Sequence, residues 1–421
     1  CEKMQFLAKL AFKNLFRHKL RTFVSIIAIA FGVMIVVFAR GLIVGMIDSL
    51  SADHIQYNSG HIKIIDQEYY ERERLLPLNY PVDGFDGQGL RDMIAGLKGI
   101  EDVKMVIPRL KFGAMVSTEN ELVTMSGWGV NPDQELTFTD IEDYLVEGRM
   151  VQPGQLEVVM GSVLLKKLDR KVGDKVTILF NTAFDSLRGI TFRIVGRLES
   201  GLKMLNEIVF YLPLDQAQKL LYLDDQTTEL LLVTADKKLV PEVLPRVKSL
   251  LAEHGDERYQ ALSYRETSDL IPLMDLSAVI YNFIYIFLLS LSCIVVVNTM
   301  IMIVKDRTKE IGMMSALGLE SKDILQLFVL EGAIMGVIGS LAGAVSGYLM
   351  NSYLARVGFD YGEALSGISS DLIFNTMIYP VSSIEVSIFA FVLGVVIVTI
   401  ACLIPARRAA RLEPTVAMRE G

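Results

Sequence analysis

The chain has 421 residues, of which 52% are hydrophobic and 21% are charged, and its formal net charge is −8 at pH 7. This composition is too apolar for an ordinary soluble protein and too charged for one wholly inside a membrane, so we expect a membrane part and a globular part. The acidic balance provides no overall basic field and no nucleic-acid motif is present, so we expect no nucleic-acid partner.

The three cysteines form no recognisable pattern. Cys293 and Cys402 lie within apolar stretches and Cys1 is the first residue, so they indicate neither a disulfide framework nor a zinc site. A cysteine at position 1 is compatible with lipidation, with an added residue or with an upstream start.

The first 21 residues are basic and amphipathic. Lys9, Lys13 and Arg17 interrupt a set of apolar residues near helical spacing: Phe6, Leu7, Leu10, Ala11, Leu15 and Phe16. This pattern predicts a cytoplasmic amphipathic helix over residues 1–21 that lies at the membrane surface. An irregular basic tail is the alternative.

Four stretches are long and apolar enough to cross a membrane. A spanning helix needs about 20 mainly apolar residues, at about 1.5 Å each, to cross a hydrocarbon core of about 30 Å. We predict spans at 22–50, 276–304, 324–354 and 381–404. The first is longer than the core is thick, so we expect its outer end to project from the bilayer.

Basic residues in the short flanking segments indicate the orientation. They gather in segments 1–21, 305–323 and 405–421, whereas the loop 355–380 carries Arg356 against three acidic residues. We therefore expect both termini in the cytoplasm and the segment 51–275 outside.

The segment 51–275 predicts an α+β extracytoplasmic domain. Strand-like runs occur at 61–65, 103–116, 121–125, 175–180, 191–195, 208–212 and 229–233, and helical runs at 90–97, 163–168, 214–221 and 240–251. Turn signals such as Asn131-Pro132-Asp133 and Gly173-Asp174 separate them.

No catalytic or metal site is predicted. His54, His61 and His254 are too scattered for a metal motif, and no phosphate-binding GxxxxGK[ST] sequence occurs. We therefore expect a chain that is not an ATPase and binds no cofactor, with ATP and Mg held by a separate partner.

Three motifs in chain order carry a family resemblance. They are Asn14 to Thr22, then Lys305 to Gly318 with Phe328 and Glu331, and finally Pro405 to Arg419. They resemble the N-L-x-R-x-K-x-R-T, R-x-x-E-I-G-x-x-x-A-L-G…F-x-x-E and P-x-x-x-A-x-x-x-x-P-x-x-A-L-R motifs of FtsX-like ABC permeases. Between the first two spans, Gly161 to Val176 is similar to the G-x-x-L-A…G-D-x-V stretch of MacB-type periplasmic domains.

The resemblance implies partners and a coupling site. Such permeases work as two subunits, identical or homologous, on a dimer of ABC ATPase subunits. The segment 305–323 would then be a cytoplasmic coupling helix, whose charged start and apolar residues suit a partner's groove; a solvated anchoring loop is the alternative. The implied ATPase-coupling residues are Arg307, Lys309, Glu310, Ile311, Gly312, Met314 and Leu317.

Small residues mark one face of the third span. A stripe of glycines lets another helix approach closely, and the neighbour could be span two, span four or a second subunit. The helix-packing residues are Gly332, Gly336, Gly339, Gly343 and Gly347.

Within the family the chain is most similar to the transmembrane subunits of lipoprotein-releasing systems. That implies a bacterial inner-membrane location and mechanotransmission, in which ATPase closure is relayed to the periplasmic domain, with lipoprotein or lipid cargo passing to a periplasmic carrier. The alternatives are a MacB-like efflux permease for peptides, toxins or antibiotics with a periplasmic adaptor, and a non-transporting regulator of cell-wall hydrolases.

Two further features bear on the cargo. Aromatic and apolar residues at the outer end of span two are candidate cargo-facing residues, with an interfacial aromatic belt as the alternative: Tyr281, Phe283, Ile284, Tyr285 and Phe287. The segment from Asn181 to Gly189 is short and lacks proline, unlike the longer hairpin of the carrier-recruiting lipoprotein permease subunit. The chain therefore resembles the partner subunit without that hairpin, or a homodimeric permease.

Overall fold

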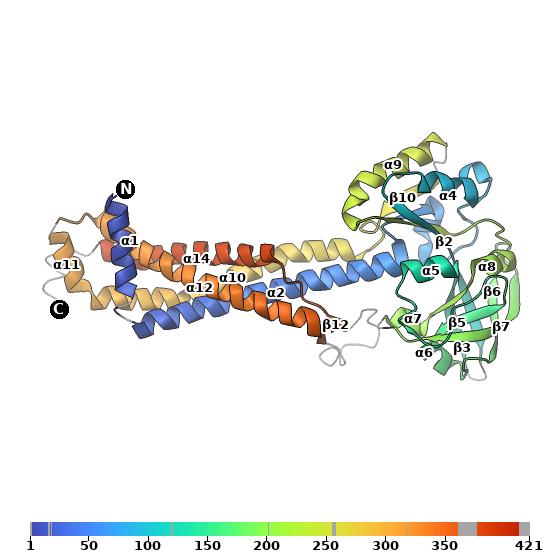
Figure 1. Ribbon diagram of the computed structural model, residues 1–421, viewed down its shortest axis with the longest axis horizontal. Helices are drawn as coiled ribbons and strands as arrows, with labels where there is room; N and C mark the ends of the chain where they lie inside the picture. The colour runs from blue at the N-terminus through green and yellow to red at the C-terminus, as the bar shows by residue number, and fades with distance from the viewer. Residues whose placement is uncertain are drawn as a thin grey trace. The chain divides into compact units, whose positions relative to one another are not determined.

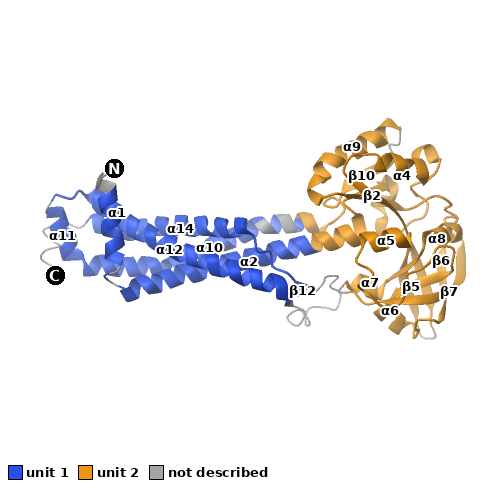
Figure 2. Ribbon diagram, in the orientation of Figure 1, with its two compact units in different colours: residues 1–49, 273–361, 377–421 blue, residues 50–272, 362–376 orange. Residues whose placement is uncertain are grey.

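The computed structural model describes residues 2–15, 17, 19–118, 121–200, 202–254, 258–316, 318–360 and 377–411. The chain divides into two compact units (Figure 2). Unit 1 comprises residues 1–49, 273–361 and 377–421, and unit 2 comprises residues 50–272 and 362–376.

Unit 1 is built from helices and one short strand pair, β11 with β12 (Figure 1). Four of the helices, α2, α10, α12 and α14, are long and apolar enough to cross a membrane. Each extends a few residues beyond one or both ends of its predicted span, and the predicted tail 405–421 begins inside α14. The elements are α1 Glu2–Leu15, α2 Lys19–His54, α10 Leu270–Asp306, α11 Thr308–Ala316, α12 Ser321–Val357, α14 Ile384–Ala410, β11 Phe359–Asp360 and β12 Met377–Ile378.

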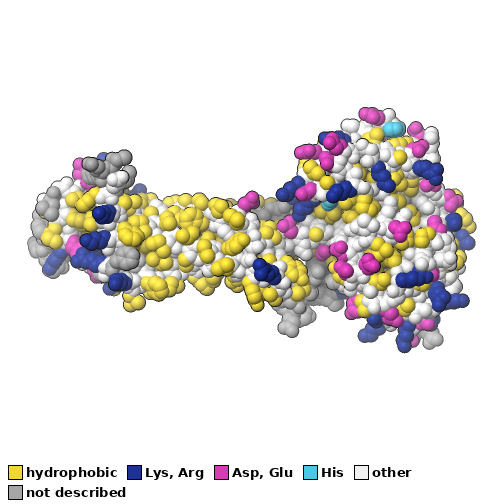
Figure 3. Space-filling model, viewed as in Figure 1, with side chains coloured by type: hydrophobic (Ala, Val, Ile, Leu, Met, Phe, Trp, Pro, Cys, Tyr) yellow, Lys and Arg dark blue, Asp and Glu magenta, His cyan; other side chains and the backbone are white. Residues whose placement is uncertain are grey.

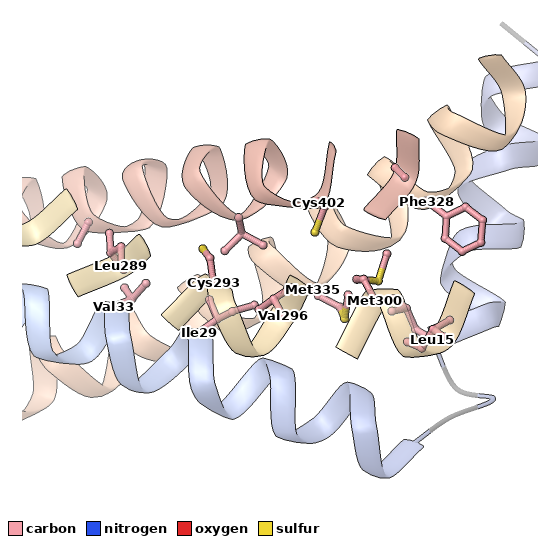
Figure 4. Packing of buried hydrophobic residues seen from close by; sticks show 14 of the residues in the cluster. Leu15, Ile29, Val33, Leu289, Cys293, Val296, Met300, Phe328, Met335 and Cys402 are labelled. Carbon is pink, nitrogen blue, oxygen red and sulfur yellow. The ribbon is translucent and has the colours of Figure 1, made fainter. Parts of the chain in front are cut away.

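The helices of unit 1 share one apolar core. Residues three or four apart on α10 are buried in one core with Ile29 and Val33 of α2: Tyr285, Leu289, Cys293, Val296, Met300 and Ile303. This spacing keeps one stripe of a helix facing its neighbours. Figure 4 shows Leu289, Cys293 and Val296 near these two α2 residues. Many large apolar side chains of these helices are also exposed, and Figure 3 shows hydrophobic side chains over much of the visible face of the bundle. Such a surface suits lipid rather than water.

The glycines of α12 lie where neighbouring helices approach. A Cβ built on Gly332 or Gly336 would meet Cys402 or Val398 of α14. A Cβ on Gly339, Gly343 or Gly347 would meet α2, at Ile29, Ala30 and Val37 respectively. The neighbours of the stripe are therefore spans four and one, and not span two.

Helix α1 packs against α12 with part of its apolar stripe. Leu7 and Ala11 are buried with Leu327 of α12. Phe6 and Phe12, from the same helix, remain exposed. The amphipathic helix therefore divides its apolar residues between the bundle and its surroundings.

Unit 2 contains a ten-stranded, mostly antiparallel sheet with the order β10-β1-β9-β2-β3-β8-β5-β7-β4, in which β6 pairs with β2 and β7. The pairs β3·β8 and β5·β7 are parallel. The strands are β1 Ile62–Asp66, β2 Val103–Ser117, β3 Leu122–Val130, β4 Leu145–Gly148, β5 Glu157–Gly161, β6 Lys175–Asn181, β7 Leu187–Leu198, β8 Val209–Pro213, β9 Glu229–Thr234 and β10 Tyr259–Ser263.

Helices cover this sheet and complete its cores. One apolar cluster forms under α4 and α9 and another under α6 and α8. The helices are α3 Gln67–Glu71, α4 Leu90–Lys98, α5 Pro132–Phe138, α6 Ser162–Lys167, α7 Lys203–Glu207, α8 Leu214–Leu221 and α9 Val240–Glu253, with short turns η1 Ile55–Ser59, η2 Glu73–Leu75, η3 Phe85–Gly87 and η4 Lys237–Leu239. Over its described residues, unit 1 is thus helical apart from the β11·β12 pair, and unit 2 is an α+β domain, as expected.

One predicted turn proved to be a helix start. The Asn131 side chain accepts hydrogen bonds from the backbone N–H groups of Asp133 and Gln134, and Pro132 occupies the first turn of α5. Asparagine as N-cap followed by proline at the first helical position is a helix-starting signal, because proline lacks the N–H that a helix start leaves unpaired. The sequence analysis took the same residues for a turn.

Candidate functional site

The first two sequence motifs meet at one end of unit 1. Asn14 and Arg17, from the first motif, contact residues of the second motif in α11 and α12. The Asn14 amide donates to Glu331 at 2.7 Å, and an Arg17 nitrogen lies 2.6 Å from a Glu310 oxygen. Arg21 pairs with Asp306 at the end of α10. Residues distant in the sequence therefore form one polar group, here called the coupling cluster: Asn14, Arg17, Arg21, Asp306, Arg307, Glu310 and Glu331.

Arg307 is the centre of the coupling cluster. Its guanidinium donates to Glu331 at 3.1 Å and to Glu310 at 3.1 Å, and it lies over the Phe328 ring at 5.9 Å. Both Arg307 and Glu331 are buried. A buried charge is tolerated when it is paired and hydrogen-bonded, so this arginine fixes the start of α11 to α12.

Glu310 links α11 to the segment after α1. Its partial burial raises the carboxyl pKa, but hydrogen bonds and charge from Arg307 and Arg17 outweigh this and hold the pKa of Glu310 below its usual value. The carboxylate is therefore ionised at neutral pH and pairs with both arginines.

The predicted coupling residues divide into inward and outward groups. Ile311 is fully buried in the bundle core and Gly312 is buried, so neither presents a side chain to a partner. Lys309 is exposed on α11, as is Met313, which the prediction did not include. Met314 is half-buried, and Leu317 lies outside the described residues. Ile311, one of the apolar residues expected to enter a partner's groove, instead packs in the bundle core of this chain.

The five candidate cargo-facing residues of α10 do not share one face. Tyr285 is buried in the bundle core and Tyr281 is half-buried beside it. Phe283 and Phe287 are 70% and 62% exposed, and Ile284 is also exposed. Only the last three present an apolar surface to the outside of this chain.

A buried charge network in unit 2 was not predicted. Lys63 of β1 and Lys111 of β2 each contact Glu229 of β9, with N···O distances of 2.8 and 2.9 Å, and Lys63 also pairs with Glu73. Glu229 and Lys63 are fully buried. Burial raises the pKa of Glu229, but Lys111, Lys63 and Arg109 outweigh it and lower the pKa to about 2. The carboxylate is thus charged at every physiological pH.

A second buried ion pair adjoins the first. Arg109 of β2 donates to Glu135 of α5 at 2.7 Å, and both side chains are fully buried. The Trp128 ring lies 5.0 Å from the Arg109 guanidinium carbon and 4.8 Å from the Lys111 nitrogen. Cation–π contact adds to the pairing of both cations.

The network also holds the turn that follows α2. Arg109 donates to the Tyr57 carbonyl at 2.8 Å, and Lys111 donates to the Asn58 side chain at 2.9 Å. Tyr57 and Asn58 belong to η1, a single π-helical turn continuous with α2. Such turns are frequently found at functional sites. The end of α2 is therefore tied to β2 by two buried cations.

The sequence contained a signal for this network. Lys63, Arg109, Lys111 and Glu229 all stand within runs otherwise typical of buried strands. Charged residues are almost never fully buried unless paired, so charges of both signs in such runs predict ion pairs. The sequence alone, however, does not show which strands are neighbours in the sheet. Among the residues that the structure describes, no group of three or more His, Cys, Asp and Glu could hold a metal.

Comparison with known families agrees with this architecture. Residues 22–250 match the MacB-like periplasmic core domain, more than half of the chain, and residues 282–414 match the FtsX-like permease C-terminal region. The second match contains four members of the coupling cluster: Asp306, Arg307, Glu310 and Glu331.

Three relatives illustrate the range of similar proteins. The lipoprotein-releasing system transmembrane protein LolC of Neisseria meningitidis is 22% identical over 78% of this chain and 81% of its own length. An uncharacterised ABC transporter permease of Methanocaldococcus jannaschii is 24% identical over 97% of this chain and 96% of its own. The macrolide export ATP-binding/permease protein MacB of Nitrobacter winogradskyi is 25% identical over 98% of this chain but 60% of its own.

Two of these relatives are named for different cargoes, lipoproteins and macrolides, and the other is named as a permease without a cargo. This chain matches most of the length of the lipoprotein-releasing transmembrane protein and of the permease. The Nitrobacter relative is named as an ATP-binding/permease protein, and this chain covers only 60% of its length. Four candidate spans, an external domain of the MacB type and the FtsX-like match together identify the class. The chain belongs to the FtsX-like, MacB-type family of ABC transporter permeases.

Proposed function

We propose that this chain is the permease subunit of an ATP-driven machine that extracts lipoproteins from the bacterial inner membrane and releases them toward a periplasmic carrier by mechanotransmission. A dimer of ATPase subunits, which bind ATP and Mg, would act on α11 from the cytoplasm. A second permease subunit, identical or homologous, would complete the membrane part.

The observation that carries the cargo proposal is the exposed apolar face of α10. Phe283, Ile284 and Phe287 present apolar surface beyond the chain's own core. Moving a sixteen-carbon acyl chain from a membrane into water costs about 12 kcal/mol at about 0.8 kcal/mol per CH₂. Extraction therefore requires an apolar surface that accepts the chain, and these three residues can form part of it.

Mechanical relay is supported by the attachment of α2. This helix runs without interruption from Lys19 to His54, and the turn that follows it is held to β2 by Arg109 and Lys111. The His54 ring contacts the Thr267 hydroxyl at 2.9 Å, just before α10. Displacement of α2 would thus act on buried, paired charges of the sheet rather than on a loose loop.

A release assay tests the cargo. The chain, its partner ATPase and an acylated lipoprotein are reconstituted in vesicles, and we expect ATP-dependent appearance of lipoprotein bound to a soluble carrier. Phe283→Ala and Phe287→Ala should each reduce release severalfold without changing complex assembly, because they remove apolar surface only. Ile294→Ala, another exposed position on α10, is the matched control and should release normally.

Other results would favour the alternatives. Absence of release, together with drug or toxin sensitivity after deletion, indicates a MacB-like exporter, a reading that the Nitrobacter relative also supports. Dependence of cell-wall hydrolase activity alone on the chain indicates a regulator that transports nothing.

A further inference from the structure

A cavity of about 260 Å³ lies among α1, α2 and α12, away from the candidate cargo surface on α10. The residues that line it are apolar except for Lys19 and Thr22. The lining consists of Phe12, Leu15, Lys19, Thr22, Phe23, Ile26 and Ile338. The two polar groups in this lining have different surroundings.

Thr22 serves the structure of the cavity wall. Its hydroxyl donates to the Leu15 carbonyl at 3.1 Å, which links the start of α2 to the end of α1. Leu15 and Thr22 are both buried. The corner between the two helices is therefore held by a hydrogen bond, and the one hydroxyl donor of Thr22 is not available to a ligand.

Lys19 carries a charge that has no partner within the described part of the chain. Its neighbours Arg17 and Arg21 pair with Glu310 and Asp306, whereas the Lys19 side chain is exposed and makes no ion pair with a described residue. Among the residues that the structure describes, Lys19 therefore places an unpaired cation at the edge of an apolar cavity.

The placement of these residues matches the layers of a bilayer. Lys19 is the first residue of α2, and Phe23 and Ile26 follow within about two turns of the same candidate span. Ile338 lies on the candidate span α12. A lysine at a span end reaches the headgroup layer while its apolar neighbours stay in hydrocarbon. Figure 3 shows other basic side chains at this end of unit 1.

We propose that this cavity binds an anionic phospholipid, with an acyl chain against Phe12, Phe23 and Ile338 and the phosphate on the Lys19 amine. Apolar grooves with basic rims between spans favour anionic lipids, because the cation attracts an anionic headgroup more strongly than a headgroup of zero net charge. The proposal rests on the cytoplasmic orientation of this end but not on the cargo. A lipid here would fill the space behind α1 and thereby support the coupling cluster.

Fluorescence quenching in vesicles tests the site. The chain has a single tryptophan, Trp128, so a Phe23→Trp variant of the full chain adds one reporter in the cavity, and the parent chain gives the background. Brominated phosphatidylglycerol is compared with brominated phosphatidylcholine at equal mole fraction. We expect about fivefold stronger association of the anionic lipid, from one basic residue near the surface.

Variants of two lysines assign the effect. Lys19→Ala should abolish the preference for phosphatidylglycerol over phosphatidylcholine, and Lys19→Arg should keep it. Lys13→Ala, which removes a basic residue of the same end that does not line the cavity, should leave it nearly unchanged. Soluble glycerol phosphate should fail to relieve the quenching, since it lacks the acyl chain.

Four outcomes would overturn the proposal. They are equal quenching by both lipids, a preference that survives Lys19→Ala, displacement by glycerol phosphate, and shielding of the reporter indole of Phe23→Trp from both lipids, which would mean that protein covers the cavity. None of these bears on lipoprotein release, so failure here and failure of the proposed function are distinguishable.

Discussion

In unit 1 buried ion pairs lie at one end of the bundle, around Arg307 and Glu331, whereas in unit 2 they lie on central strands of the sheet, around Glu229. The surroundings explain the difference. A bundle in lipid gains little from apolar burial, because lipid is as apolar as its side chains, and it is held by close helix packing instead. The strands that carry these charges also contribute to large buried apolar clusters, whose burial can offset the desolvation of the charges.

The helix contacts of unit 1 and the buried ion pairs of unit 2 differ in how easily they can shift. Packed helices can shear past one another by small shifts, whereas a buried network of paired charges rigidifies its surroundings. We therefore expect unit 2 to respond to α2 as a body and unit 1 to adjust along its helix contacts.

The largest effect should come from Glu229→Gln. The substitution leaves Lys63 and Lys111 buried with less compensating charge, and loss of one partner of a buried pair costs about 3–5 kcal/mol. Denaturant unfolding in detergent, followed by the fluorescence of Trp128, measures it. Glu147→Gln, at an exposed pair with Arg197, should change stability by less than about 0.5 kcal/mol. Equal effects would remove the distinction between buried and exposed pairs.

The same residue predicts a pH dependence. The folded pKa of Glu229, about 2, lies below its ordinary value of 4.5. The stabilisation is therefore complete above pH 4.5 and is lost as pH falls toward 2. In the Glu229→Gln variant, the stability measured by Trp128 fluorescence should fall less between pH 4.5 and pH 2 than in the parent chain. An unchanged acid profile would contradict the charged, paired state.

Arg307→Met should have the next largest effect, in unit 1. Glu331 would keep only the Asn14 amide as a partner, and leaving a buried charged group poorly paired costs about 2–3 kcal/mol. Adding Glu331→Met should restore most of the thermal stability, because both charges are then gone. If the double variant is no more stable than Arg307→Met, the pair is not the source of the effect.

Gly343→Ala should cost somewhat less and act through sterics. The new Cβ would lie 2.4 Å from the Ala30 carbonyl oxygen and 2.8 Å from the Val33 Cβ, so α2 must shift, at about 1–3 kcal/mol. Thermal unfolding followed by helical circular dichroism measures it. Gly113→Ala, with no atom within 4 Å of its Cβ, is the control. A neutral Gly343→Ala would show that unit 1 does not depend on this close approach.

Lys309→Glu should have the smallest effect on stability and a clear effect on coupling. The side chain is exposed on α11, so we expect a change in stability below about 0.5 kcal/mol but weaker stimulation of the partner ATPase. Lys175→Glu, an exposed lysine of β6 in unit 2, is the matched control. Normal stimulation by Lys309→Glu would place the ATPase contact elsewhere.

Apolar length and periodicity were sufficient to predict the four spans, most of the strands of unit 2 and the helices over them. These features depend on near neighbours in the chain, as helix spacing and strand alternation do. Short elements without strong patterning were not predicted. They include α3, α7, β4, β5, β10, β11 and β12, and the helix α5, whose start was interpreted as a turn.

Only the tertiary structure decided what the chemically interesting residues do. The sequence predicted that Arg307, Glu310 and Ile311 belong to a coupling segment, but not that Asn14 and Arg17 complete the cluster or that Ile311 is buried. It placed Tyr285 and Phe287 in one helix, and packing separated them into a buried and an exposed residue. Lys63, Lys111 and Glu229 meet because β1, β9 and β2 are adjacent strands. Local patterns determine which elements form, whereas contacts between distant residues depend on how those elements pack.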